Sequence, residues 1–91
     1  MNDSGKTDSV RDFVVRLLAE RGAVPESSAL SVYRYLDTGH IDSLAFIKFI
    51  FRIEERFRIQ FTEPEMLGDR IRTVGGLVAL IEEKQGRPGN A

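Results

Sequence analysis

The chain contains no cysteine, so disulfide bonds and thiolate metal sites are excluded and stability must come from packing. It also contains a single histidine, His40. A histidine metal site or a Ser–His dyad would rest on that one residue. We therefore interpret His40 as a solvent-exposed loop residue and expect no metal site.

Neither sign of charge dominates the chain. Lys and Arg total 13 against 14 Asp and Glu, which gives a formal net charge of -1. Such a balance creates no long-range field that would gather nucleic acid. Apolar runs of the roughly 20 residues needed to cross a bilayer are missing, and the polar start lacks the apolar core of a signal peptide. We expect a cytoplasmic protein without a nucleic-acid or membrane partner.

Apolar residues recur at helical spacing, which predicts an all-α fold. A first helix follows a capping-box-like start at Ser9 and ends at Gly22. A second helix covers about residues 43–58, with Asp42 as its N-cap. One face of this helix is expected to form the core with apolar residues of the first and last helices. These are Phe46, Phe49, Ile50, Ile53 and Phe57, packed against Phe13, Val14, Leu17, Val78 and Ile81.

The second half of the chain predicts a short helix and a final longer one. A capping box at Thr62 starts a helix over about residues 63–68, and Thr73 caps the last helix. Gly75 and Gly76 should soften that helix start, because glycine costs up to about 1 kcal/mol relative to alanine. Residues 23–42 form a long connection with a helical turn near residues 28–36.

These elements predict an antiparallel four-helix bundle, with three longer helices, one short helix and a long first loop. At 91 residues the chain makes one domain. We expect the domain to cover residues 9–84, between disordered tails at residues 1–8 and 85–91.

Ser43 is the main functional candidate, because it opens the second helix directly after Asp42. No His, Lys or Cys stands beside it in a pattern that would activate it as a nucleophile. A serine in this setting is typical of an attachment point. Asp-Ser-Leu is also simply a good helix start, so the tripeptide alone decides little.

Three segments in the right order resemble the acyl and peptidyl carrier protein family. They are Asp42-Ser43-Leu44, residues 52–59 at the end of the second helix, and residues 71–77 at the start of the last. The resemblance implies that Ser43 carries a 4'-phosphopantetheine arm from coenzyme A, which holds an acyl or aminoacyl group as a thioester. Asp42 would cap the helix and add a recognition charge. The protein itself would not be an enzyme.

The resemblance also implies a set of partners and a monomeric state. The partners are a phosphopantetheinyl transferase, an acyl- or aminoacyl-activating ligase, and downstream synthase or transferase enzymes. Residues 39–44 are similar to free-standing carriers of specialised pathways. Many carriers of primary fatty acid synthesis have an acidic second helix, whereas here Lys48, Arg52, Arg56 and Arg58 accompany Glu54 and Glu55.

An apolar stripe lies off the core face of the second helix and begins one residue after Ser43. We interpret it as a docking surface for partner enzymes; the alternative is that the long loop folds over it. The candidate surface consists of Leu44, Ile47, Lys48, Phe51, Arg52 and Glu55.

Other functions and roles remain open. The second helix could be a nucleic-acid recognition helix, although acidic residues lie nearby and the isoelectric point is about 5.8. The chain could also be an unmodified, carrier-like module that only docks proteins. Within the loop, Tyr33 and Tyr35 either line an acyl chamber or are semi-buried by packing.

Overall fold

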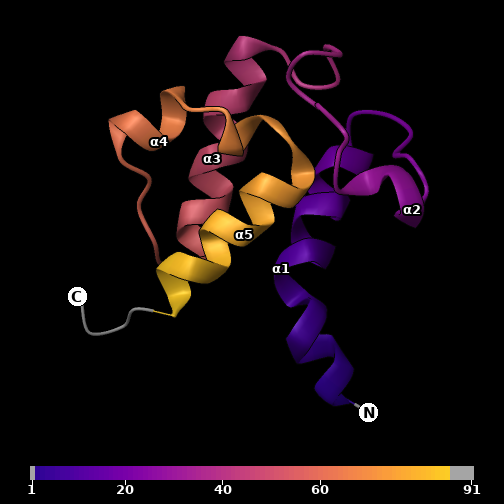
Figure 1. Ribbon diagram of the computed structural model, residues 1–91, viewed down its shortest axis with the longest axis vertical. Coiled ribbons are helices and arrows are strands. Elements are labelled where there is room, and N and C mark those ends of the chain that lie inside the picture. The colour runs from indigo at the N-terminus through magenta and orange to yellow at the C-terminus, as the bar shows by residue number, and fades with distance from the viewer. Residues whose placement is uncertain (1, 87–91) are drawn as a thin grey trace.

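The computed structural model describes residues 2–86, with side chains from Val10 onward. In this range three long helices form, α1 (Asn2–Ala19), α3 (Ser43–Phe57) and α5 (Val74–Gln85). Two short helices, α2 (Ser27–Leu30) and α4 (Glu63–Leu67), and a 3-10 turn, η1 (Arg70–Arg72), connect them. Helices α1 and α3 run in opposite directions, while α5 contacts both α1 and η1 (Figure 1). The predicted all-α bundle is confirmed, with α2 as one further short helix in the long loop.

The helix starts follow the predicted caps. The Asp42 carboxylate accepts the Ala45 N–H at 2.8 Å, and Thr62 forms both bonds of a capping box with Glu65. The Thr73 hydroxyl accepts the Gly76 N–H at 3.0 Å. Capping is decided by residues within one turn, so these three starts could be located from local sequence.

The ends of the chain differ from the local pattern. Helix α1 begins at Asn2 instead of near Ser9, and it ends at Ala19, before Gly22. Helix α5 ends at Gln85. The domain limits of 9 and 84 stay predictions, and residues 87–91 of the second predicted tail lie outside the described residues.

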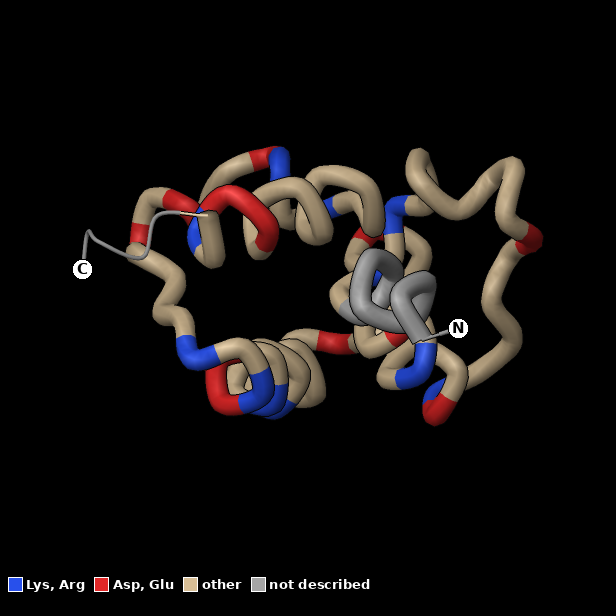
Figure 2. The backbone as a smooth tube through the Cα atoms, turned by 90° about the horizontal axis from the view of Figure 1, so that it is seen from below, with Lys and Arg blue, Asp and Glu red and all other residues tan. Residues whose placement is uncertain are grey.

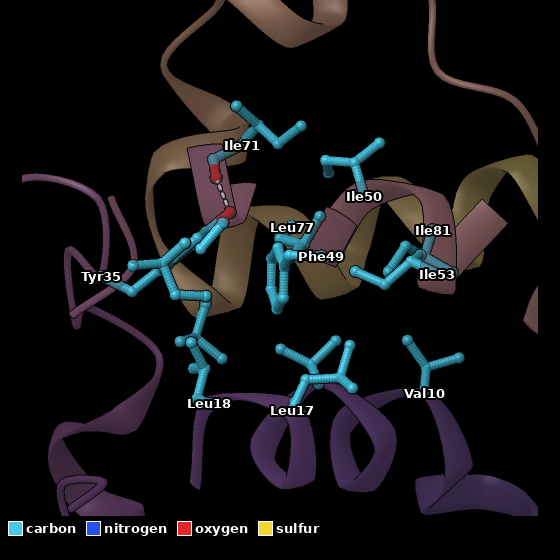
Figure 3. Close-up of a cluster of buried hydrophobic side chains, with 14 of the residues drawn as sticks. Val10, Leu17, Leu18, Tyr35, Phe49, Ile50, Ile53, Ile71, Leu77 and Ile81 are labelled. Carbon is cyan, nitrogen blue, oxygen red and sulfur yellow. Dashed lines mark hydrogen bonds between the residues drawn. The ribbon is translucent and has the colours of Figure 1, made fainter. Parts of the chain in front are cut away.

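The core lies between α3, α1 and α5. In Figure 3, Phe49 and Ile53 of α3 point toward Leu17 of α1 and toward Leu77 and Ile81 of α5. All the predicted core residues belong to one cluster. Within it Val14, Leu17, Phe49, Ile50, Ile53 and Ile81 are buried, and Phe13, Phe46, Phe57 and Val78 are partly buried.

Gly75 and Gly76 allow other backbone segments to approach the start of α5 closely, and the expected softness of this helix start stays a prediction. A Cβ on Gly75 would lie 2.8 Å from the Ser31 carbonyl oxygen, and one on Gly76 would overlap the Arg70 carbonyl. The Gly75 N–H donates to that Ser31 oxygen at 2.8 Å. The glycines therefore let the long loop and η1 pack directly on α5.

Two phenylalanines on α3 separate core packing from helix propensity. We predict that Phe49→Ala lowers the free energy of unfolding by about 3–5 kcal/mol, because Phe49 is buried. Phe51→Ala is the matched control and should cost about 0.5 kcal/mol or less, because Phe51 is 62% exposed. Urea unfolding followed by circular dichroism measures both. Equal stabilities for the two variants would contradict the assigned core face.

Candidate functional site

Ser43 is the first residue of α3, and its side chain is exposed. The preceding residue, Asp42, has extended backbone angles and caps the helix, so the chain turns from extended to helical at the serine. The N–H groups of Ser43 and Leu44 precede the first intrahelical hydrogen bond. They lie at the positive end of a 15-residue helix dipole. This setting suits an anionic group attached to the serine.

Buried side chains and hydrogen bonds hold the residues that precede Ser43 in place. Ile41 is buried, and its N–H donates to the Tyr35 carbonyl at 3.4 Å. The Tyr35 side chain is 0% exposed, and its hydroxyl donates to the Ile71 carbonyl (Figure 3). Burial raises the pKa of the Tyr35 phenol well above its ordinary value. Of the two interpretations left open for Tyr35, the structure supports packing.

His40 corrects the interpretation as a solvent-exposed loop histidine. It is half-buried, and both ring nitrogens form hydrogen bonds. Nε2 lies 2.8 Å from the Leu18 carbonyl oxygen, and Nδ1 lies 2.7 Å from the Tyr33 hydroxyl. Leu18 is distant from His40 in the sequence, and the loop turns Tyr33 toward His40. The local sequence pattern therefore could not reveal either hydrogen bond. Because both nitrogens are engaged, His40 does not serve Ser43 as a general base.

The apolar stripe on α3 is open to solvent. Leu44 is 80% exposed, Ile47 47% and Phe51 62%. The long loop therefore does not fold over these residues, which excludes the alternative considered for them. Together with Ser43 they occupy one side of α3, about 100° wide, next to the core face.

Of the charged residues predicted for the partner surface, Arg52 is engaged elsewhere. Its guanidinium binds Glu20 of α1, with N–O distances of 2.8 and 3.4 Å. The hydrogen bond from Arg52 lowers the pKa of Glu20 below its ordinary value. Lys48 and Glu55 are exposed beside the stripe. Glu20 was missed by sequence reasoning, because the pair joins two helices 32 residues apart in the chain.

A groove between α1 and α3 runs behind the site. Its floor includes Leu17, Ile41 and Phe49, its rim includes Lys48, and its volume is about 240 Å³. The α3 residues lining it project about half a turn around the helix axis from Ser43. An arm on Ser43 therefore starts on the other side of α3, alongside the exposed stripe.

Positively and negatively charged residues are interspersed along the chain. Figure 2 shows Lys and Arg segments beside Asp and Glu segments. Among the described residues, no group of His, Asp and Glu is arranged to hold a metal ion. The same part of the chain contains no helix that is long and apolar enough to cross a membrane.

Comparisons with known proteins include two relatives that share a name. Residues of the chain are 29% identical to an acyl carrier protein of Kineococcus radiotolerans over 73 residues, 80% of this chain and 88% of the relative. They are 27% identical to an acyl carrier protein of Chlamydia caviae over 78 residues, 86% of this chain and 99% of the relative. These two similarities support the carrier protein family for this chain. No protein-family model matches the chain, and no solved structure does.

Asp37 connects the loop before Ser43 to η1 through ion pairs. Its carboxylate binds Arg72 at 2.6 Å and Arg34 at 2.5 Å. Hydrogen bonds from Arg72 and then Arg34 hold the pKa of Asp37 below its ordinary value of 3.8. A carboxyl whose folded pKa is depressed contributes stability above its unfolded pKa, and that contribution is lost as pH falls through the folded value.

We predict that Asp37→Asn makes the protein less stable at neutral pH but flattens the loss of stability below about pH 4. The flattening follows because the variant has no Asp37 carboxylate to protonate. Thermal unfolding of parent and variant across this pH range measures it. Glu26→Gln is the control, because the Glu26 side chain makes no capping hydrogen bond. If the Asp37→Asn and Glu26→Gln proteins followed the same acid-side slope, the Asp37 ion pairs would contribute nothing.

Proposed function

We propose that the protein is an acyl carrier whose Ser43 bears a 4'-phosphopantetheine arm. The thiol of the arm would hold an acyl or aminoacyl group as a thioester and pass it between biosynthetic enzymes. The observation that carries the proposal is the exposed serine at the start of a long, firmly capped helix. The shared name of the two relatives supports acyl carriage in general.

The local chemistry at Ser43 fits a phosphodiester. Attachment forms a bond from the serine oxygen to phosphorus, while the bond to the nucleotide part of coenzyme A breaks. The unpaired N–H groups of the first turn and the helix dipole favour the resulting anion. The serine proton must go to the transferase, because the ring nitrogens of His40 are already engaged. Carrier proteins of this family are not enzymes, and this chain supplies position, not catalysis.

The surface beside Ser43 suggests how partner enzymes recognise the carrier. The exposed stripe of Leu44, Ile47 and Phe51 offers apolar contact next to the arm. Lys48 forms no ion pair within the described residues, whereas Arg52 is paired with Glu20. We propose dedicated partners with an apolar groove and acidic or neutral edges, in a specialised pathway of the cytoplasm. The mixed charge on α3 and the sequence of residues 39–44 support that pathway class.

The runner-up function is an unmodified module that only docks proteins, and the same exposed stripe favours it. The nucleic-acid hypothesis gains no support from the basic residues of α3. Arg52 binds Glu20, and the Arg56 guanidinium lies over the rings of Phe13 and Phe57. Engaged guanidinium groups are poorly suited to reading base edges or neutralising phosphates.

Ser43→Ala tests the attachment site. We predict that the parent protein, incubated with coenzyme A and a promiscuous phosphopantetheinyl transferase, gains the mass of one arm. The Ser43→Ala protein should gain none and keep its helical circular dichroism, because Asp42 still caps α3. Ser28→Ala, which replaces an exposed serine of α2, should be modified like the parent. Modification of the Ser43→Ala protein would overturn the assignment.

Charge reversal on α3 tests partner chemistry. We predict that the double variant Lys48→Glu, Arg52→Glu slows loading by the pathway's own activating ligase and improves recognition by an acyl-transferring enzyme of fatty acid synthesis. Like charges across an interface slow encounter, and salt reduces the effect. Lys48→Glu alone should produce most of the change, because Arg52 already faces Glu20. Loading rates against salt concentration measure it. Cognate rates that stay unchanged at low salt would mean that these charges form only a solvated face.

A further inference from the structure

His40 lies three positions before Ser43. Its side chain takes part in a connected set of hydrogen bonds to which the proposed function assigns no role. We propose that His40 is a positioning residue, which holds the segment entering Ser43 in the conformation that the phosphopantetheinyl transferase binds. We name the set formed by Tyr33, Thr38 and His40 with the Leu18 carbonyl the polar clamp. The inference rests on the proposed function, because it concerns modification of Ser43.

The chemistry of the groups in the polar clamp indicates which atoms donate and which accept its hydrogen bonds. The Leu18 carbonyl can only accept, so Nε2 of His40 donates to it at 2.8 Å. In the neutral ring Nδ1 is then an acceptor, and the Tyr33 hydroxyl donates to it at 2.7 Å. The Thr38 hydroxyl lies 3.4 Å from the Tyr33 oxygen and 3.4 Å from the Tyr35 carbonyl oxygen, and it donates its single proton to one or the other. The His40 N–H donates to Thr38 Oγ1, also at 3.4 Å, which closes the set.

The polar clamp joins three elements. Leu18 belongs to the last turn of α1, and its carbonyl oxygen accepts the Arg21 N–H at 2.9 Å as well as the hydrogen bond from His40. The Tyr33 carbonyl accepts the N–H of Val74, the first residue of α5, at 3.1 Å. The rings of Tyr33 and His40 meet edge to face, with centroids 5.5 Å apart. His40 is therefore fixed simultaneously to the end of α1 and, through Tyr33, to the start of α5.

His40 anchors the loop between the Asp37 ion pairs and the buried Ile41. The preceding turn, residues 37–39, is exposed, and Gly39 has a φ of +80°, which L side chains rarely adopt. After His40 come Ile41, which is buried, and Asp42, which caps α3. Removing the clamp leaves these two anchors, so α3 still starts at Ser43. Thr38, Gly39 and His40 would then sample more conformations, while Asp37 stays paired with Arg34 and Arg72.

Loosening this segment should change the Michaelis constant of the transferase and leave its turnover number unchanged. A partner that binds one conformation sees only the fraction of the carrier in that conformation, and its apparent affinity falls by that fraction. Once bound, the serine and the helix start are the same as in the parent. The expected signature is thus a raised KM for the carrier with kcat preserved.

Three variants remove the clamp in steps, and the probe is coenzyme A with a promiscuous phosphopantetheinyl transferase. Tyr33→Phe deletes only the hydroxyl, and His40→Gln keeps an amide donor for the Leu18 carbonyl, whereas His40→Ala deletes both bonds. For His40→Ala we expect KM to rise about five- to tenfold, with kcat within about twofold. His40→Gln should recover part of the loss. Adding Tyr33→Phe to His40→Ala should change little further, because the two residues act together.

A matched control separates positioning from stability. Leu80→Ala truncates a buried side chain of α5 that lines the groove beside α4, away from the clamp. All variants are compared at a temperature where circular dichroism shows them folded. If Leu80→Ala raises KM as much as His40→Ala, the effect is one of stability and positioning is overturned.

Nitrogen NMR provides a direct readout, because the chain has one histidine. We expect the parent at neutral pH to show the Nε2–H tautomer, and Tyr33→Phe to shift the Nδ1 resonance. The opposite tautomer would overturn the clamp. A parent that is modified while all clamp variants keep its KM overturns positioning but leaves the carrier function intact. A parent that gains no arm overturns both.

Discussion

The buried hydrogen bond from the Tyr35 hydroxyl to the Ile71 carbonyl is the contact on which the arrangement of the site depends. A long loop precedes Ser43, and a loop of this length orders its residues only where something compensates the lost entropy. Tyr35 is completely buried, packs on Phe49 with ring centroids 5.4 Å apart, and connects the loop to η1. A buried phenol must find a partner, so this position also fixes where η1 lies.

The fixed loop gives α3 two independent faces. One face, centred on Phe49 and Ile53, is committed to the core. The other face carries Ser43 and the exposed stripe, and it does not contribute to the core among the described residues. Substitutions on that second face should therefore cost little stability, as expected for the docking surface proposed there.

Local features of the structure were predictable from sequence. The caps at Asp42, Thr62 and Thr73 depend on neighbours within one turn, and the core face of α3 follows from helical periodicity alone. The apolar stripe could be located in the same way. Whether it is exposed depended on whether the long loop folds over it. Here sequence left two alternatives and the structure decided between them.

Contacts between distant segments were not predictable. His40 reaches the Leu18 carbonyl across 22 positions, and Arg52 reaches Glu20 across 32. Gly75 and Gly76 give no sign in sequence of the backbone atoms that pack against them. Each of these depends on how segments far apart in the sequence pack together, which local periodicity does not indicate. Residue types identified the candidate site, but only tertiary contacts explain how it is held.

Carriage through Ser43 is tested most directly by tandem mass spectrometry of the protein isolated from cells that produce it naturally. We expect peptides containing Ser43 to carry 4'-phosphopantetheine, free or with an acyl or aminoacyl group in thioester linkage. Protein recovered entirely without a modification on Ser43, from cells whose other carriers are modified, would contradict it and favour the unmodified docking module.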